Sequence, residues 1–245
     1  MNVIYEPAGR AREYSELACN LYRGCTHGCR YCFGPAVLRT TREKFYEMAA
    51  PRKNIIEQFE KDANKLSGDA RRILFCFTSD PYQPLERTER LTRQALEVVN
   101  KYGLNSQVLT KGSADLILED LSLMKDAGTH LGVTLCFSDD DTRRYWEPNA
   151  STVEERLSVL QEAHQAGIYT WVSLEPVIVP EQALEVIQIA APFVDFWKVG
   201  KLNHMKDVEQ HVDWTTFLIN AEDLFKKNNA KYYIKNDLLA SVLMG

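Results

Sequence analysis

The chain has 245 residues, of which 45% are hydrophobic and 26% are charged. This composition is typical of a globular protein and excludes a disordered, collagen-like or coiled-coil chain. The length fits one large α/β domain with a well-buried core, so we expect a single domain over residues 1–245. A formal net charge of −5 argues against tight, non-specific binding to a nucleic acid backbone, which needs a concentrated positive field.

The charge is distributed unevenly along the chain. Residues 1–53 contain nine Lys and Arg against five acidic residues, whereas the remainder is acidic. This basic segment is compatible with an anionic substrate. The N-terminal residues lack the apolar stretch of a signal peptide, and no apolar run is long enough to cross a bilayer. We therefore expect a cytoplasmic protein that does not associate with membranes.

Short apolar runs alternate with helical patterns from residue 51 onward, which is typical of repeated βα units around a parallel sheet. The expected strands are rich in Val, Ile, Phe, Tyr, Trp and Leu, as buried parallel strands are. They cover residues 17–23, 72–78, 106–110, 131–137, 169–174, 194–199 and 231–234. The expected helices cover residues 54–65, 89–102, 116–127, 152–166, 181–190 and 214–227.

Local signals support the ends of several helices. Gly103, Gly128 and Gly167 each follow an expected helix and suit the left-handed position after its last turn. Ser151, followed three residues later by Glu154, predicts a capping box. Six βα units are too few for a closed eight-stranded barrel. The sequence therefore predicts an α/β fold, a partial (β/α)6 TIM-type barrel, with residues 231–234 as an extra C-terminal strand and chemistry at the C-terminal strand ends.

Three of the six cysteines crowd into eight residues, at Cys25, Cys29 and Cys32 in the loop of residues 24–34. Disulfides are not expected inside the cell, so metal ligation is the leading explanation. Three thiolates can ligate three irons of a cubane cluster and leave the fourth iron without a protein ligand. A zinc knuckle is the alternative, with His27 or a distant cysteine as its fourth ligand.

The spacing Cys-x3-Cys-x2-Cys, followed by the aromatic Phe33, resembles the cluster loop of the radical S-adenosylmethionine (SAM) superfamily. This resemblance implies a [4Fe–4S] cluster whose open iron binds the methionine moiety of SAM. It also implies one-electron reduction by a flavodoxin or ferredoxin. Cleavage of SAM then gives a 5′-deoxyadenosyl radical, which abstracts hydrogen from a substrate.

Further segments resemble proteins related to spore photoproduct lyase, a DNA repair branch of this superfamily. They are YEPAGRA at 5–11, NLYRGC at 20–25, TSDPYQP at 78–84, and Glu147-Pro148. The resemblance implies a nucleic acid or nucleotide substrate. A radical enzyme acting on a small molecule or peptide is one alternative, and a non-enzymatic zinc-binding module is another. No feature of the sequence predicts an oligomeric state.

The same resemblance implies roles for residues that follow the expected strands. Thr78, Ser79 and Asp80 correspond to the segment that contacts the amino group of the methionine moiety. Lys111 matches a lysine that contacts its carboxylate, and Ser138 resembles a serine that contacts the cofactor.

The hydrogen donor of the lyase is a cysteine immediately before the Thr-Ser-Asp segment, and this chain has Phe77 there. Cys76 lies one residue earlier, and strand alternation places it on the opposite side from Phe77 unless a bulge intervenes. Cys76 and Cys136 are candidate hydrogen donors if they face the barrel interior; the alternative is that both are small core residues.

Polar residues near the later strand ends are candidate substrate contacts, with salt bridges inside the barrel as the alternative. They are Glu175, Lys198 and Asn203. Aromatic loop residues could stack on a base, and two arginines could hold phosphates. These residues are Tyr82, Tyr145 and Trp146 for stacking, and Arg39 and Arg42 for phosphates.

Overall fold

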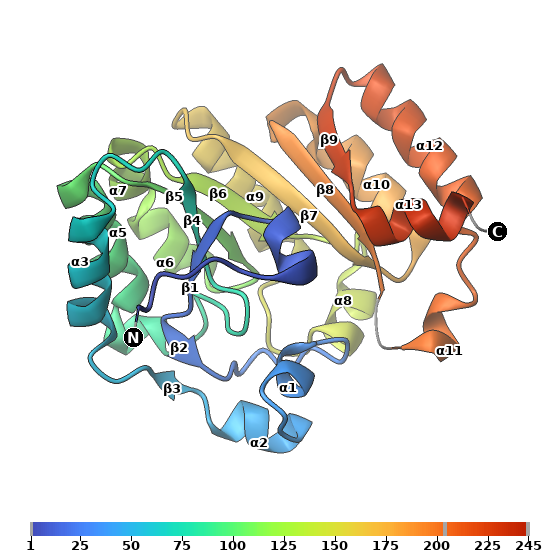
Figure 1. Ribbon diagram of the computed structural model, residues 1–245. Helices are drawn as coiled ribbons and strands as arrows, with labels where there is room; N and C mark the ends of the chain where they lie inside the picture. The colour runs from blue at the N-terminus through green and yellow to red at the C-terminus, as the bar shows by residue number, and fades with distance from the viewer. Residues whose placement is uncertain (1, 203–204, 244–245) are drawn as a thin grey trace.

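The computed structural model describes residues 2–202 and 205–243. Seven parallel strands form one curved sheet in the order β1-β4-β5-β6-β7-β8-β9, with β1 and β9 at its edges (Figure 1). This arrangement confirms the α/β partial barrel, and β9 is the extra C-terminal strand. The strands are β1 (Leu17–Cys19), β4 (Arg72–Phe75), β5 (Asn105–Thr110), β6 (His130–Thr134), β7 (Thr170–Val177), β8 (Phe196–Lys201) and β9 (Lys231–Ile234).

Most of the helices cover the outer side of the sheet in Figure 1, because they connect one parallel strand to the next. The longer ones are α3 (Ile55–Lys65), α5 (Leu91–Tyr102), α9 (Val153–Gln165), α10 (Pro180–Ala190) and α12 (Trp214–Lys227). Shorter ones are α4 (Glu86–Glu89), α6 (Ala114–Glu119), α7 (Leu121–Asp126), α8 (Asp140–Trp146), α11 (Lys206–Glu209), α13 (Asn236–Leu243) and two 3-10 helices, η1 (Gly9–Glu13) and η2 (Ala191–Phe193). No described helix combines the length and apolarity needed to cross a membrane.

The two faces of the sheet bury different sets of side chains. On β4, Ile73 and Phe75 join the large core beneath the helices. Leu74 between them points to the inner side, where it packs with Ala18 and Trp171 in a separate cluster. Strands that are buried on both faces need continuous apolar sequence, which is why these segments could be found without a clear alternation.

The expected strand over residues 17–23 is divided in two. The chain leaves the main sheet after β1, and residues Tyr22–Arg23 form β2, which pairs with β3 (Ala50–Pro51) in a small antiparallel ribbon. Asn20 lies at the break. Its side-chain oxygen accepts the backbone N–H groups of Phe77 and Thr78, at 2.8 and 2.9 Å, so it holds the loop after β4 instead of extending β1.

The expected helix over residues 116–127 is also divided, into α6 and α7. Asp120 separates them because its fully buried carboxylate accepts the Tyr82 hydroxyl at 2.9 Å and the Arg93 guanidinium at 2.5 Å. This long-range network has no local sequence signal.

The expected capping box is displaced by one residue. Thr152 caps α9 with Glu155 as its partner, whereas the Ser151 hydroxyl donates to the carbonyl of Gly112. The glycines at 103, 128 and 167 all have positive φ, at 62°, 60° and 80°, as expected for residues that end helices.

The N-terminal segment crosses the inner side of the sheet. Lys198 on β8 anchors it, because its ammonium donates to the carbonyls of Glu13 and Tyr14, both at 2.8 Å. Gln107 on β5 donates to the same Tyr14 carbonyl at 2.8 Å. Burial, assisted by the nearby Lys235, lowers the pKa of Lys198 from 10.5 to about 8.

This lowered pKa predicts a pH-dependent stability. Between pH 8 and about 10.5 the unfolded chain binds more protons at Lys198 than the folded chain, so the free energy of unfolding rises with pH in that window. We expect the rise to reach about 3 kcal/mol and to be absent in Lys198→Met. Denaturant titrations of both proteins across this range measure the difference. Parallel profiles for the two proteins would contradict the expectation.

Candidate functional site

A cavity of about 590 Å³ opens at the C-terminal ends of the strands. This is a typical volume for a small-molecule site, and strand ends are where parallel α/β folds place their chemistry. The loop after β4 contributes residues 76–80 to its wall, and Lys111 follows β5. Glu175 and Pro176 come from β7, and Lys235 follows β9.

Cys25, Cys29 and Cys32 all line this cavity. The loop that brings them together depends on Gly24 and Gly28, which have φ of 63° and 72°. A side chain at Gly24 would also collide with the backbone of α2 (Arg42–Glu47), which packs behind the loop. The loop therefore brings all three cysteines to the wall of one cavity.

Burial raises the pKa of the Cys29 thiol to about 12, and it also raises the pKa values of Cys25 and Cys32. The mutual proximity of the sulfurs adds to the effect. Such thiols lose their protons only beside a strong positive charge, which bound metal supplies. The three side chains thus fit an iron–sulfur cluster, and without one they stay protonated at neutral pH.

Among residues 2–202 and 205–243, no group of three His, Cys, Asp or Glu side chains is arranged to hold a metal ion. The zinc alternative names His27 as a possible fourth ligand beside the three cysteines. His27 is almost fully buried, with its Nδ1 3.5 Å from the carboxylate of Asp80. Burial lowers the pKa of His27, so its imidazole is a neutral neighbour of the cysteine loop.

Asp80 joins the ends of two strands. One carboxylate oxygen accepts Tyr82 N–H at 2.8 Å and the Thr110 hydroxyl at 2.6 Å, and the other accepts Lys111 N–H at 2.8 Å. With its acceptor sites used in this way, Asp80 orients the loop. The neighbouring Thr78 hydroxyl is buried in the cavity wall without a hydrogen-bond partner among the described residues. The Ser79 hydroxyl lies in the same wall, next to the Cys76 thiol.

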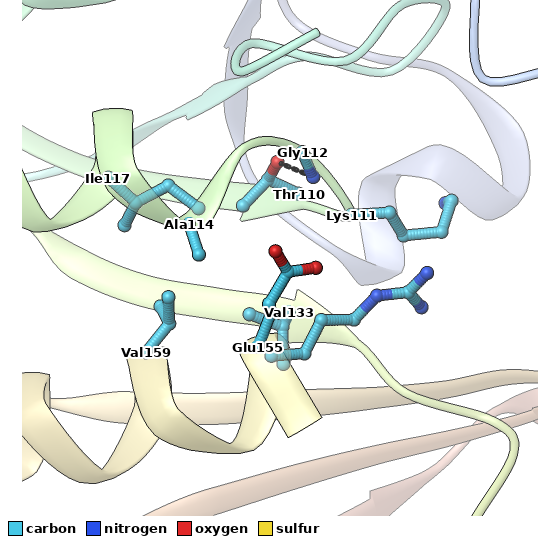
Figure 2. A pocket seen from close by; sticks show the side chains of 9 residues that line it. Thr110, Lys111, Gly112, Ala114, Ile117, Val133, Glu155 and Val159 are labelled. Carbon is cyan, nitrogen blue, oxygen red and sulfur yellow. Dashed lines mark hydrogen bonds between the residues drawn. The ribbon is translucent and has the colours of Figure 1, made fainter. Parts of the chain in front are cut away.

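Lys111 brings positive charge to the cysteines. In Figure 2 its side chain points away from the apolar residues Ile117 and Val159. The dashed hydrogen bond from Gly112 N–H to the Thr110 hydroxyl lies between them. Its ammonium lies 5.9 Å above the Tyr31 ring, and within the described residues nothing accepts a hydrogen bond from it.

The charge state of Lys111 follows from its neighbours. Burial lowers its pKa, but the opposite charges of Cys29, Glu147 and Asp80 outweigh burial and raise the pKa overall. Glu147 is itself fully buried, in an ion pair of 2.5 Å with Arg156, and it accepts the Tyr31 hydroxyl. This network, which sequence reasoning did not identify, keeps the aromatic ring and the ammonium beside the cysteine loop.

Only one of the three candidate substrate residues is found in the described cavity lining. Glu175 lines the cavity, where it accepts the Tyr14 hydroxyl and forms an ion pair with Lys235 at 2.8 Å. Lys198 instead holds the N-terminal segment and lies outside the described cavity lining. Asn203 lies outside the described residues. Tyr14 was not predicted, because only the tertiary fold brings it to β7.

The two candidate hydrogen donors, Cys76 and Cys136, differ in their access to the cavity. Cys76 lines the cavity together with Phe77, because β4 ends at Phe75 and strand alternation does not apply beyond it. Its thiol accepts Leu21 N–H at 3.5 Å. Cys136 is fully buried outside the described lining, and its thiol donates to the Ser173 carbonyl at 3.8 Å.

Two other predicted contacts lie away from the cavity. Ser138 is outside its described lining, and its hydroxyl donates to Glu185 at 2.5 Å. Tyr82 is fully buried with its hydroxyl on Asp120, so its ring is not available to stack on a base. Tyr145 is 57% exposed and lies beneath the guanidinium of Arg30 at 4.2 Å.

Solved structures with similar folds include a variant of spore photoproduct lyase, with a TM-score of 0.69 and 14% identity over 94% of this chain and 79% of that chain. A lyase variant with bound AdoMet and dinucleoside spore photoproduct has a TM-score of 0.66 and 16% identity, over 94% and 78%. Streptococcus suis SuiB bound to precursor peptide SuiA has a TM-score of 0.67 and 10% identity, over 93% and 50%.

Curated relatives include an uncharacterized protein of Methanocaldococcus jannaschii, 26% identical over 192 residues, which are 77% of this chain and 71% of that protein. An uncharacterized protein of Mycobacterium tuberculosis is 27% identical over 171 residues, or 65% of this chain and 48% of that protein. This chain therefore spans about half the length of the mycobacterial relative. Residues 19–191, well over half of the chain, match the family model of the radical SAM superfamily. The protein belongs to this superfamily, as an enzyme that uses a [4Fe–4S] cluster and S-adenosylmethionine.

Proposed function

We propose that Cys25, Cys29 and Cys32, in the loop of residues 24–34, hold the [4Fe–4S] cluster of a single radical SAM domain. The observation that supports this assignment is the content of the cavity. Three cysteines line it together with the Thr78 hydroxyl and the Lys111 ammonium, and neither of these two groups has a hydrogen-bond partner among the described residues. Polar groups left unsatisfied at a buried site are costly, so they indicate a missing ligand.

The methionine moiety of SAM supplies partners for these groups. Its carboxylate suits the Lys111 ammonium, and its amino group suits the hydroxyl oxygens of Thr78 and Ser79, which can accept hydrogen bonds. Asp80 acts through the loop that it orients. When SAM is bound and the cluster has received one electron from a flavodoxin or ferredoxin, the pair supplies the 5′-deoxyadenosyl radical.

The proposed substrate is a nucleic acid or nucleotide, from which the radical abstracts hydrogen. The sequence segments shared with the lyase branch support it, as does the fold similarity to a lyase solved with a dinucleoside lesion. The aromatic rings of Tyr14 and Phe77 in the cavity wall suit a base. A peptide is the second candidate, favoured by the similar fold of SuiB, which was solved with a precursor peptide.

Cys76 is the proposed hydrogen donor to the product radical. It lines the cavity, and burial raises the pKa of its thiol to about 12, so the S–H bond remains intact at neutral pH. Cys136 lacks this access.

Replacement of Lys111 tests the proposed SAM site. We expect Lys111→Met to weaken SAM binding about 10- to 100-fold, because a hydrogen bond to a charged group contributes about 1.5–3 kcal/mol. Equilibrium binding to reconstituted protein of equal iron and sulfide content is the measurement. Lys125→Met, on the exposed surface of α7, is the matched control. Unchanged affinity in Lys111→Met would place the carboxylate elsewhere.

Deuterium transfer identifies the substrate class. Reduced, reconstituted protein is incubated with SAM and either a perdeuterated oligonucleotide or perdeuterated peptides, and 5′-deoxyadenosine is analysed by mass spectrometry. We expect deuterium from the oligonucleotide only, and no product from the triple Ala variant of Cys25, Cys29 and Cys32. Transfer from peptides alone would replace the nucleic acid proposal with the peptide candidate.

A further inference from the structure

The three cysteines lie on an excursion from the main sheet, residues 20–53, which we call the cysteine excursion. The ribbon of β2 and β3 closes its base, and it contains α1 (Gly34–Val37) and α2. Figure 1 shows these elements projecting away from the seven-stranded sheet. The excursion therefore offers a surface that is separate from the helices around the barrel.

The cysteine excursion is basic. It contains seven Lys and Arg against two acidic residues, in a chain whose net charge is −5. Within the part of the chain that the structure describes, none of these seven forms an ion pair. Elsewhere basic residues such as Arg71, Lys101 and Arg143 do pair with carboxylates. The positive charge of the excursion is thus not neutralised by the protein itself.

The cysteine loop is accessible from one direction. Its inner side faces the cavity. Another side is covered by α8 and the turn after it, through hydrogen bonds from Arg30 N–H to the Trp146 carbonyl at 2.8 Å and from Asn149 N–H to the His27 carbonyl at 3.0 Å. The side that remains is the one on which α2 packs.

On that side a single layer of α2 side chains separates the cysteine loop from the protein surface. Arg42 and Tyr46, one turn apart on α2, both donate to the main-chain carbonyl of Cys29, at 2.8 and 3.2 Å. Both side chains are partly exposed, and the exposed Arg39 and Lys44 flank them in sequence. A protein bound to this surface would therefore lie one residue away from a cysteine of the loop.

We infer that this outer basic surface of the cysteine excursion docks an acidic, one-electron carrier protein. The inference rests on the proposed function, because it requires the three cysteines to hold the cluster. One electron passes from the reduced carrier to the oxidised cluster. No covalent bond is formed or broken, and no proton is transferred. Electron-transfer encounters need only a small interface, and opposite charges accelerate their formation.

A nucleic acid is the other polyanion that such a surface could attract. The substrate, however, must reach the cavity in which hydrogen is abstracted, whereas an electron donor only has to approach the cluster from outside. Phe45 of α2 lines the cavity, but Arg39, Arg42 and Lys44 are outside the described lining, and this placement favours the electron carrier.

The test uses the double charge reversal Arg39→Glu with Lys44→Glu, since neither residue lines the described cavity or contacts the cysteines. Lys226→Glu with Lys227→Glu, on the exposed end of α12, is the matched control. Rates of cluster reduction are measured with flavodoxin hydroquinone and with dithionite. The ratio of the two rates is the readout, so any loss of cluster content cancels.

We expect the ratio to fall about tenfold at low ionic strength in the excursion variant and to approach the wild-type value at high salt. The control should keep the wild-type ratio. An unchanged ratio, an equal fall in the control, or a loss of DNA binding with normal reduction by flavodoxin would each overturn the inference. SAM cleavage driven by dithionite should continue in both variants, so failure of the proposed cluster site would be seen separately.

Discussion

The carboxylate of Asp80 is the contact on which the site depends most. It accepts three donors, and two of them are backbone N–H groups, one in the loop after β4 and one directly after β5. Because it is buried and fully engaged, its loss would leave several donors unsatisfied at the cavity wall. Through this one side chain, the loop that carries Thr78 and Ser79 and the strand end that carries Lys111 keep a fixed separation.

The cysteine loop depends on a second constraint, the cost of burying ionisable groups together. Thiols in this environment stay protonated, and the ammonium of Lys111 beside them offsets only part of that cost. The buried pair of Glu147 and Arg156 fixes Tyr31 against this ammonium. In the proposed site, the positive charge of an iron–sulfur core would ionise these thiols, and the carboxylate of a zwitterionic ligand would pair with the Lys111 ammonium.

Much of the fold could be predicted from the sequence, because parallel strands buried on both faces are continuous apolar runs and the cysteine spacing is local. The breaks at Asn20 and Asp120 could not, since each residue forms hydrogen bonds with partners that are distant in the chain. The same reason applies to the site. Lys111 follows a recognisable strand, but the pairing of Glu175 with Lys235 and the contact with Tyr14 exist only once the sheet has formed.

Direct contact between SAM and the cluster is measured by electron–nuclear double resonance on the reduced protein, with SAM labelled isotopically at the amino nitrogen and the carboxylate oxygens. If three cysteines leave one iron open inside this cavity, hyperfine coupling to both labels should appear, and it should vanish in the triple Ala variant. A reduced cluster that binds SAM without coupling to either label would contradict a cluster held by Cys25, Cys29 and Cys32 alone.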